Sequence, residues 1–351
     1  MPRDNQEHVD SAEAAGLRYV SDIMPGIRRK KSGRGFTYLR PDGSVVNNGN
    51  ELARIKGLVI PPAWNEVWIC TNPNGHIQVT ARDARGRKQY RYHPKYRAIR
   101  DETKFGRILE FSDLLPALRD RVEQDLQLSG LPRDKVLASV VRLLEKTLIR
   151  VGNEEYAREN KSYGLATMRR RHVEVSGHTL RFDFRGKSGL MHSVAVTDRR
   201  VARIIQHCQE LPGQELFQYL DDDGKRQTID AGDINDYLKR ISGRDITAKD
   251  FRTWSGTMLA AFELRALGPG LTEKEARSNV VKAIDRVAKR LGNTRAVCRK
   301  YYIHPVVLEA YLAGSVPPIP PQPADPKRER PSGALRKEEL AVLEFIQARL
   351  K

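Results

Sequence analysis

Residues 291–305, LGNTRAVCRKYYIHP, contain two adjacent tyrosines, Tyr301 and Tyr302. Apolar periodicity before the stretch predicts a helix, and Gly292 is a natural C-cap because glycine adopts the left-handed conformation readily. An amide, Asn293, and a basic run then separate the helix end from the tyrosines. Taken alone, the stretch is compatible with a basic helix end packed on DNA or on nothing. It gives no local reason to choose between the tyrosines.

Periodicity around this stretch predicts a mainly helical C-terminal part. Thr272 and Glu275 have the spacing of a capping box for the helix that ends at Gly292. A helix that begins at Pro132 is expected to stop at Gly152. The other helices expected here cover 233–241, 249–267, a segment that starts at Pro305, and 337–350.

The N-terminal residues have the alternation of a small antiparallel sheet, with strands over 67–70, 77–81 and 89–93. The basic run 27–35, IRRKKSGRG, is expected to be a solvated or phosphate-contacting loop. Together the patterns predict an α+β protein. A small N-terminal antiparallel β-sheet domain (1–101) precedes a larger, mainly α-helical catalytic domain with a β-hairpin (102–316). A proline-rich linker and C-terminal helix complete the chain (317–351).

The hairpin is predicted in the middle of the chain. Leu180, Phe182 and Phe184 alternate with polar residues, and a second alternating run follows the turn Gly186-Lys187-Ser188-Gly189. Lys187 therefore lies at the hairpin tip. Because hairpin tips are commonly basic for solubility alone, this lysine is weak evidence of function in isolation.

The charge balance of the chain points to a polyanionic partner. Its 351 residues include 62 Lys+Arg against 44 Asp+Glu, a net charge of +18. Each phosphate that Lys or Arg neutralises releases condensed counterions, so this excess suits nucleic acid. The alternative is a generally basic surface. Nucleic acid is favoured, because basic residues recur between aromatic ones along the whole length.

Several classes of function are disfavoured. Three scattered cysteines imply neither a disulfide framework nor a zinc site. There is no phosphate-cradling glycine loop, no paired carboxylates at a plausible metal site and no serine-histidine-acid arrangement. This pattern argues against an ATPase, a two-metal nuclease and the usual hydrolases. Without a signal peptide or an apolar run of membrane-spanning length, a cytoplasmic protein is expected.

A candidate DNA-binding strand lies in the N-terminal sheet. Gln89, Tyr90 and Tyr92 are interleaved with basic residues such as Arg87. Alternation places the two tyrosines on one face of the strand and Gln89 on the other. Glutamine can read an adenine edge, and tyrosine and arginine can reach phosphates. DNA contact is therefore favoured over an exposed basic edge strand that guards against aggregation.

Six segments together carry a family resemblance: GLVIPPAW, DARGRKQYRY, LIRVGNEEY, FRGKSG, AKDFRTW and GNTRAVCRKYYIHP. In this order and spacing they resemble type IB DNA topoisomerases of the compact poxvirus-like and bacterial group, over about residues 33–313. The resemblance implies an isomerase that relaxes supercoiled DNA through a 3′-phosphotyrosyl intermediate, strand swivelling and religation. It implies no cofactor, neither ATP nor metal. The implied partner is double-stranded DNA. The two predicted domains suggest a monomer that closes on the duplex as a clamp, and a place at the nucleoid is expected.

The resemblance also implies roles for individual residues. Arg150 and Arg252 match the two arginines that contact the phosphate, and Lys187 matches the lysine that protonates the leaving 5′-oxygen. Tyr302 matches the nucleophile, because the family places it nine residues after the position of Asn293. Asn293 itself replaces the usual histidine, and an amide donates a neutral hydrogen bond without carrying a proton. Further matches are the auxiliary basic Lys249, Tyr156 beside the first arginine, and the DNA-contact positions Gln89, Tyr90 and Tyr92.

Two other interpretations stay open. Tyrosine recombinases share the two arginines, the hairpin lysine and the tyrosine. They usually have histidine where this chain has Lys249, and a helical N-terminal domain. A non-catalytic basic DNA-binding protein would use the same surfaces but would leave the ordered set Arg150, Lys187, Arg252 and Tyr302 as coincidence.

Overall fold

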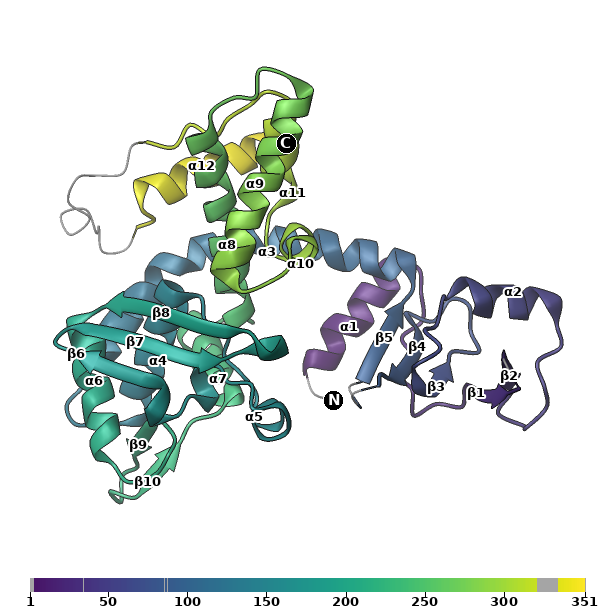
Figure 1. The fold of residues 1–351 in the computed structure, drawn as a ribbon, viewed down its shortest axis with the longest axis horizontal. Helices are drawn as coiled ribbons and strands as arrows, with labels where there is room; N and C mark the ends of the chain where they lie inside the picture. The colour runs from purple at the N-terminus through teal and green to yellow at the C-terminus, as the bar shows by residue number, and fades with distance from the viewer. Residues whose placement is uncertain (1–2, 34, 85, 87, 321–333, 351) are drawn as a thin grey trace. The chain divides into compact units, whose positions relative to one another are not determined.

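The computed structural model describes residues 3–33, 35–84, 86, 88–320 and 334–350. The chain divides into two compact units, Met1–Gly106 and Arg107–Lys351, and helix α3 (Pro94–Asp125) crosses the boundary. The first unit is built on an antiparallel sheet and the second is mainly helical, which confirms the predicted α+β class (Figure 1). Residues 321–333 of the predicted proline-rich linker lie outside the described residues.

The first unit contains a five-stranded antiparallel sheet with the strand order β2-β1-β3-β4-β5. Its core is formed by buried aliphatic side chains, among them Ile27, Ile55, Ile69 and Val79. The elements of this unit are α1 Arg3–Ala14, β1 Ile27–Ser32, β2 Gly35–Leu39, α2 Gly49–Gly57, β3 Asn65–Ile69, β4 Ile77–Arg82 and β5 Lys88–Tyr92.

Most of the basic run at residues 27–35 forms a strand instead of the predicted loop. Residues 27–32 form β1, which pairs with β2 on one side and β3 on the other. Ile27 anchors the strand in the core, and the guanidinium of Arg29 donates to the carbonyls of Pro61 (3.0 Å) and Trp64 (2.5 Å). The loop prediction was wrong because charged side chains of a strand can project from the sheet or bind backbone carbonyls without interrupting strand pairing.

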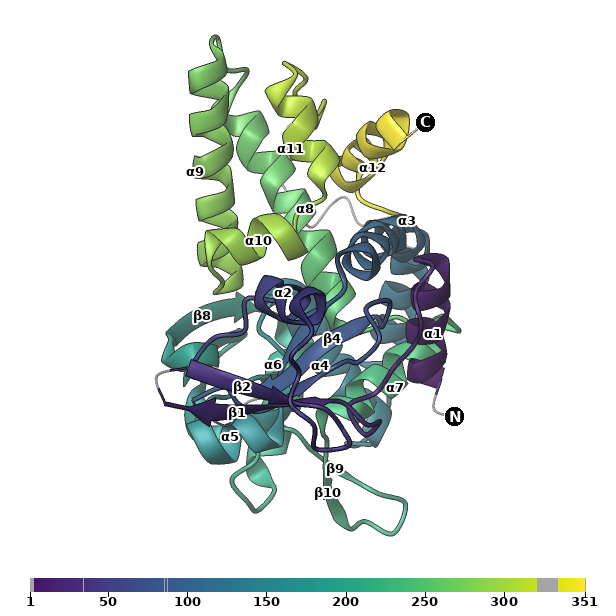
Figure 2. The same cartoon turned by 90° about the vertical axis from the view of Figure 1, so that its right-hand side faces the viewer.

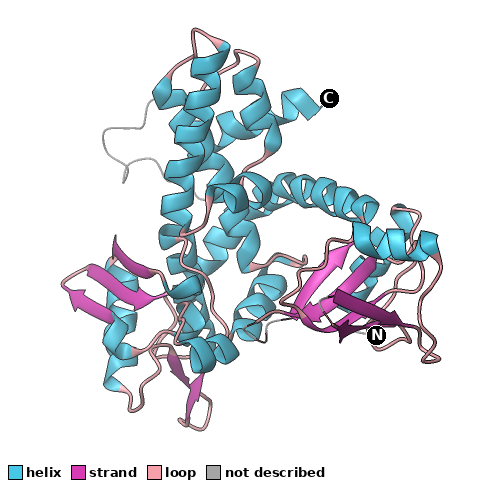
Figure 3. Cartoon of the chain, turned by 45° about the vertical axis from the view of Figure 1, so that its right-hand side comes forward, coloured by secondary structure: helices cyan, strands magenta, loops and turns pink. Residues whose placement is uncertain are grey.

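The second unit combines helices with two small antiparallel sheets, β6-β7-β8 and β9-β10 (Figure 3). Helices α8, α9 and α11 pack side by side (Figure 2), and α4 and α6 pack against the three-stranded sheet. Its helices are α4 Arg133–Thr147, α5 Glu154–Asn160, α6 Arg199–Glu210, α7 Ala231–Ser242, α8 Ala248–Leu267, α9 Glu273–Leu291, α10 Arg295–Tyr301, α11 Pro305–Leu312 and α12 Lys337–Leu350. Its strands are β6 Val173–Ser176, β7 Thr179–Arg185, β8 Met191–Thr197, β9 Gln218–Leu220 and β10 Arg226–Thr228.

The hairpin is confirmed as predicted. β7 pairs with β8 in a continuous antiparallel register, and the apolar side chains Leu180, Phe182 and Phe184 are buried. A short 3-10 turn, Lys187–Gly189, joins the two strands. Lys187 therefore lies on the connection, where it is exposed.

The helix ends show where sequence signals succeed and fail. The Thr272 hydroxyl accepts from the amide of Glu275 (3.1 Å), and Gly292 ends α9 at φ 60°, both as predicted. The predicted stop of α4 at Gly152 is wrong. The helix ends at Thr147, because Leu148 adopts the left-handed conformation at φ 60°. Leucine rarely does so, and no sequence signal marks it.

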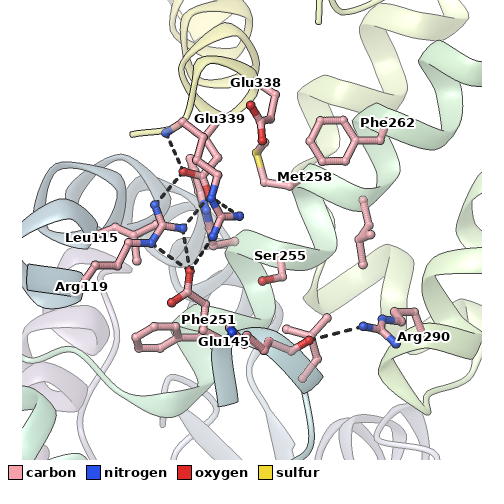
Figure 4. A pocket seen from close by; sticks show the side chains of 15 residues that line it. Leu115, Arg119, Glu145, Phe251, Ser255, Met258, Phe262, Arg290, Glu338 and Glu339 are labelled. Atoms are coloured by element: carbon pink, nitrogen blue, oxygen red, sulfur yellow. Dashed lines mark hydrogen bonds and ion pairs between the residues drawn. The ribbon is translucent and has the colours of Figure 1, made fainter. Parts of the chain in front are cut away.

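A partly buried ion-pair cluster around the buried Glu339 holds the C-terminal helix α12 (Figure 4). The Arg119 guanidinium donates to both carboxylate oxygens of Glu339 (2.7 and 2.8 Å) and to Glu145 (2.9 Å). Glu339 also accepts from the amide of Arg336 (3.0 Å). Burial alone would raise the pKa of Glu339, but Arg119 more than offsets this effect and holds the pKa below its ordinary value of 4.5. The pairing therefore contributes stability above about pH 4.5, which is lost as the pH falls through the lowered pKa.

We expect Glu339→Gln to destabilise the attachment of α12 by about 3 kcal/mol at pH 7, because Arg119 would lose a buried partner. Hydrogen exchange of the amides of residues 340–346 and urea unfolding measure the effect. The difference from wild type should shrink below about pH 4.5. Glu273→Gln, which removes the exposed i,i+4 pair with Arg277, is the control and should cost less than about 0.5 kcal/mol. Equal effects of the two changes would contradict this account.

Candidate active site

Arg252 joins three helices at the centre of the site. It lies in the second turn of α8, which begins with a capping box between Thr247 and Asp250. The side chain is 4% exposed, and its guanidinium donates to the carbonyls of Leu148 and Leu291 (2.8 Å for Leu291). Those carbonyls belong to the C-terminal ends of α4 and α9, where unpaired carbonyls and the helix dipole favour a positive charge.

Arg150 reaches the same place from the segment after α4. Its guanidinium donates to the carbonyl of Gly292 (2.8 Å) and to the side-chain oxygen of Asn293. Burial lowers the pKa of Arg150 to about 10, and the positive charge of Arg252 acts in the same direction. At neutral pH both arginines still carry their charge.

Asn293 has one hydrogen-bonding group in use and one free. Its oxygen accepts from Arg150, but its buried amide nitrogen Nδ2 has no oxygen or nitrogen partner among the described residues, and only the thiol of Cys298, a weak acceptor, is near it. A buried donor without a partner is uncommon and points to a group that arrives with a ligand. The free donor lies beside Arg150, so an anion bound next to Arg150 would accept a hydrogen bond from it.

Tyr302 is fixed to α8 through its backbone. It lies at the end of α10, and its amide donates to the carbonyl of Cys298 (3.0 Å). A Cβ on Gly256 would lie 2.4 Å from the Tyr302 carbonyl oxygen, so only glycine allows this approach. Because Gly256 lies one turn after Arg252 on the same helix, the Tyr302 ring is placed beside the guanidinium, 5.3 Å from ring centroid to Cζ. Tyr301, in contrast, is 38% exposed.

The two arginines form a positive site without a neutralising carboxylate. Neither takes part in an ion pair within the part of the chain that the structure describes. Burial also lowers the pKa of Arg252, an effect that Tyr302 partly opposes. Buried cations are normally paired with an acid. The buried Arg252 and the partly buried Arg150 have carbonyl, amide and tyrosine neighbours instead, so they define a candidate anion site.

The other predicted residues lie apart from this group. Lys187 and Lys249 are exposed, and Lys187 has no hydrogen bond or ion pair within the described residues. In the first unit, Gln89 donates to Asp83 (2.9 Å), and Tyr90 stacks on Tyr92 with ring centroids 5.9 Å apart, on one strand face as alternation predicts. Arg87 lies outside the described residues, and of Tyr156 only the backbone, in α5, is described.

Sequence reasoning missed two residues of the site. The sequence pattern predicts Gly256 only as part of a helix, although glycine inside a helix can signal a close backbone approach. His192 was read only as an alternating strand residue, yet its imidazole lies against Gly292. This contact joins β8 to the end of α9, two segments that are far apart in the sequence, so no local pattern predicts it.

Within the described residues, no cluster of His, Cys, Asp and Glu side chains has an arrangement that would hold a metal ion. No helix among them combines the length and the apolar character that a membrane crossing requires.

Comparison with known proteins shows the family to which the chain belongs. The family model for "Eukaryotic DNA topoisomerase I, catalytic core" matches residues 93–314, and that for "Bacterial DNA topoisomerase IB, N-terminal domain" matches residues 35–83. The two parts of the chain therefore match the catalytic core and the N-terminal domain of DNA topoisomerases.

Individual relatives agree with the family models. The "DNA topoisomerase 1B" of Acanthamoeba polyphaga mimivirus is 33% identical over 297 residues, which cover 82% of this chain and 88% of the viral protein. The "DNA topoisomerase 1B" of Vaccinia virus (strain Copenhagen) is 22% identical over 65% of this chain and 70% of its own. The chain belongs to the type IB DNA topoisomerases.

We expect Gly256→Ala to slow formation of a Tyr302–DNA adduct by about 100-fold, because the added methyl group would displace the tyrosine backbone. The rate is measured as covalent adduct on denaturing gels in a single turnover. Gly106→Ala is the matched control, since a Cβ at that helical glycine meets nothing within 4 Å. An adduct rate for Gly256→Ala equal to that of the control would refute the proposed anchoring of Tyr302 by α8.

Proposed function

We propose that the protein relaxes supercoiled DNA by transient cleavage of one strand. The Tyr302 hydroxyl oxygen attacks a backbone phosphorus, and the bond from phosphorus to the 5′-oxygen breaks. A 3′-phosphotyrosyl link and a free 5′-hydroxyl result. The nicked strand then swivels, and the 5′-hydroxyl attacks the link to reseal the DNA and release the tyrosine.

The observation that carries this proposal is the buried Arg252 and the partly buried Arg150, two arginines beside Tyr302 that no carboxylate neutralises. A phosphoryl transition state spreads negative charge over its non-bridging oxygens, and fixed guanidinium groups stabilise that charge. Arg150 and Arg252 take this role in the proposed mechanism. The free amide of Asn293 supplies a third donor.

Proton transfer completes the chemistry. The Tyr302 phenol gives up its proton as the bond to phosphorus forms. Lys187, on the exposed hairpin turn, donates a proton to the leaving 5′-oxygen and takes it back on religation. Lys249, in the first turn of α8, contributes positive charge near the phosphate. Because the phosphotyrosyl link conserves the bond energy, the cycle consumes no nucleotide, and no step is assigned to a metal ion.

The N-terminal sheet is proposed to hold the same duplex. Tyr90, Tyr92, Gln89 and Arg87 supply its DNA contacts, and Tyr156 contacts DNA beside Arg150. Support comes from the 44% exposed ring of Tyr90, which stacks on Tyr92 and so offers a rigid aromatic surface. The proposed working form is a monomer that closes on DNA as a clamp, in the cytoplasm at the bacterial nucleoid.

Plasmid relaxation in EDTA without ATP tests the function. We expect wild type to relax supercoiled plasmid, and Tyr302→Phe to give neither relaxation nor covalent adduct, because the nucleophilic oxygen is gone. Tyr301→Phe is the matched control and should retain both activities. Failure of wild type to relax the plasmid would exclude the proposed activity, and an adduct that depends on Tyr301 would assign the nucleophile to the wrong tyrosine. A plasmid without paired recombination sites separates relaxation from recombination.

A second set of variants tests the role of Asn293. Asn293→Ala removes one neutral donor and should slow cleavage by about 10-fold. Asn293→Asp keeps an acceptor for Arg150 but places a negative charge beside the phosphate, so we expect a loss of at least about 100-fold. Single-turnover cleavage gives both rates, with equilibrium DNA binding measured in parallel. An aspartate variant as active as the alanine variant would show that Asn293 does not face the phosphate.

A further inference from the structure

His192, the second residue of β8, lies between the two parts of the proposed site. Its imidazole stacks on the ring of Phe184 directly across the hairpin, with centroids 5.1 Å apart and planes 13° apart. Phe184 is only 3% exposed, so the core fixes one face of the imidazole. The orientation of His192 is therefore set by the hairpin itself.

Two glycines make room for this ring. A Cβ on Gly186 would lie 2.6 Å from Cδ2 of His192, and a Cβ on Gly292 would lie 2.4 Å from Cε1. Gly186 has φ −96°, which other residues adopt, so its backbone conformation does not require glycine. Glycine is required here because the imidazole of His192 lies so close. Gly292 combines this close contact with the left-handed conformation of a helix end.

Each glycine immediately precedes a residue of the proposed site, Lys187 in one case and Asn293 in the other. The end of α9 is already held, because Arg150 binds the Gly292 carbonyl and Arg252 binds the Leu291 carbonyl. Within the described residues, the backbone hydrogen bonds of residues 186–190 stay inside the hairpin, such as the amide of Gly186 to the carbonyl of Leu190 (2.7 Å). The nearest bond from another segment is that of the Tyr163 amide to the carbonyl of Arg185 (2.8 Å), which does not reach the end of α9. The imidazole is thus the contact that relates the turn to the fixed helix end.

We propose that His192 is a positioning residue that sets the place of Lys187 relative to Arg150 and Asn293. This inference rests on the proposed function, in which Lys187 protonates the leaving oxygen. The ring acts by its shape. Among the described residues neither ring nitrogen has a hydrogen-bond partner. Burial lowers the pKa of His192, and the charges of Arg150 and Arg252 lower it further, so the imidazole is neutral at pH 7.

A change of leaving group distinguishes this role from a general structural one. A duplex in which sulfur replaces the bridging 5′-oxygen at the cleavage site releases a thiol, whose pKa of about 8.5 makes protonation unnecessary. A defect that arises through Lys187 should therefore disappear on the sulfur duplex. A defect in phosphate binding or in Tyr302 should persist.

The experiment measures single-turnover adduct formation on matched oxygen and sulfur duplexes that contain a site mapped with the wild-type protein. We expect His192→Ala to be about 10- to 100-fold slower than wild type on the oxygen duplex and close to wild type on the sulfur duplex. Lys187→Ala is the reference for this pattern. His192→Phe keeps the flat ring and should resemble wild type on both duplexes. Gly186→Ala, which displaces the ring without removing it, should repeat the alanine pattern.

Three results would overturn the proposal. They are a wild-type rate for His192→Ala on the oxygen duplex, an equal defect on both duplexes, or a His192→Phe defect as large as that of alanine. The last result would show that a ring nitrogen contacts DNA. A wild-type protein that forms no adduct on either duplex would instead refute the proposed function, which keeps the two failures distinct.

Discussion

The site depends on the burial of one guanidinium, that of Arg252, against backbone carbonyls. Placing a charge in the protein interior costs several kcal/mol unless polar groups replace its water. Here the carbonyls of Leu148 and Leu291 do so, and both come from the ends of helices. The bonds that solvate Arg252 therefore also tie α4, α8 and α9 together. Arg150 repeats the pattern at the next carbonyl, that of Gly292.

The choice of carbonyls instead of carboxylates matters for function. Arg119 shows the other solution: it is paired with Glu145 and Glu339, which raises its pKa. Arg336 pairs with the same two carboxylates, so the charges of the cluster balance. For Arg150 and Arg252 burial lowers the pKa, and their partners are dipoles without net charge. The first arrangement is suited to holding a helix. The second keeps two positive charges available for an anion that arrives later.

The sequence predicted the elements better than the contacts between them. The hairpin, the capped start of α9 and its glycine end follow from local patterns, and the structure confirms each. The end of α4 was missed because Leu148 adopts a conformation that its side chain disfavours, in a place where the carbonyl is needed by Arg252. The strand β1 was missed because charge obscured its pairing. The bond from Arg252 to Leu148 joins residues 104 positions apart, which no local pattern encodes.

The fold holds the proposed nucleophile, Tyr302, more rigidly than the proposed acid, Lys187. Helix α8 positions both Tyr302 and Arg252. Arg252 lies on α8 itself, and Gly256 of the same helix contacts the backbone of Tyr302, so the separation of the two side chains is fixed before DNA binds. Lys187, in contrast, lies on the exposed turn of the β7–β8 hairpin and not on α8. A group on such a turn needs a rigid neighbour if it is to reach the same phosphate. Within the described residues, the imidazole of His192 contacts both the turn and the end of α9. The place of the proposed acid thus depends on side-chain packing, whereas the place of the proposed nucleophile depends on the backbone of α8.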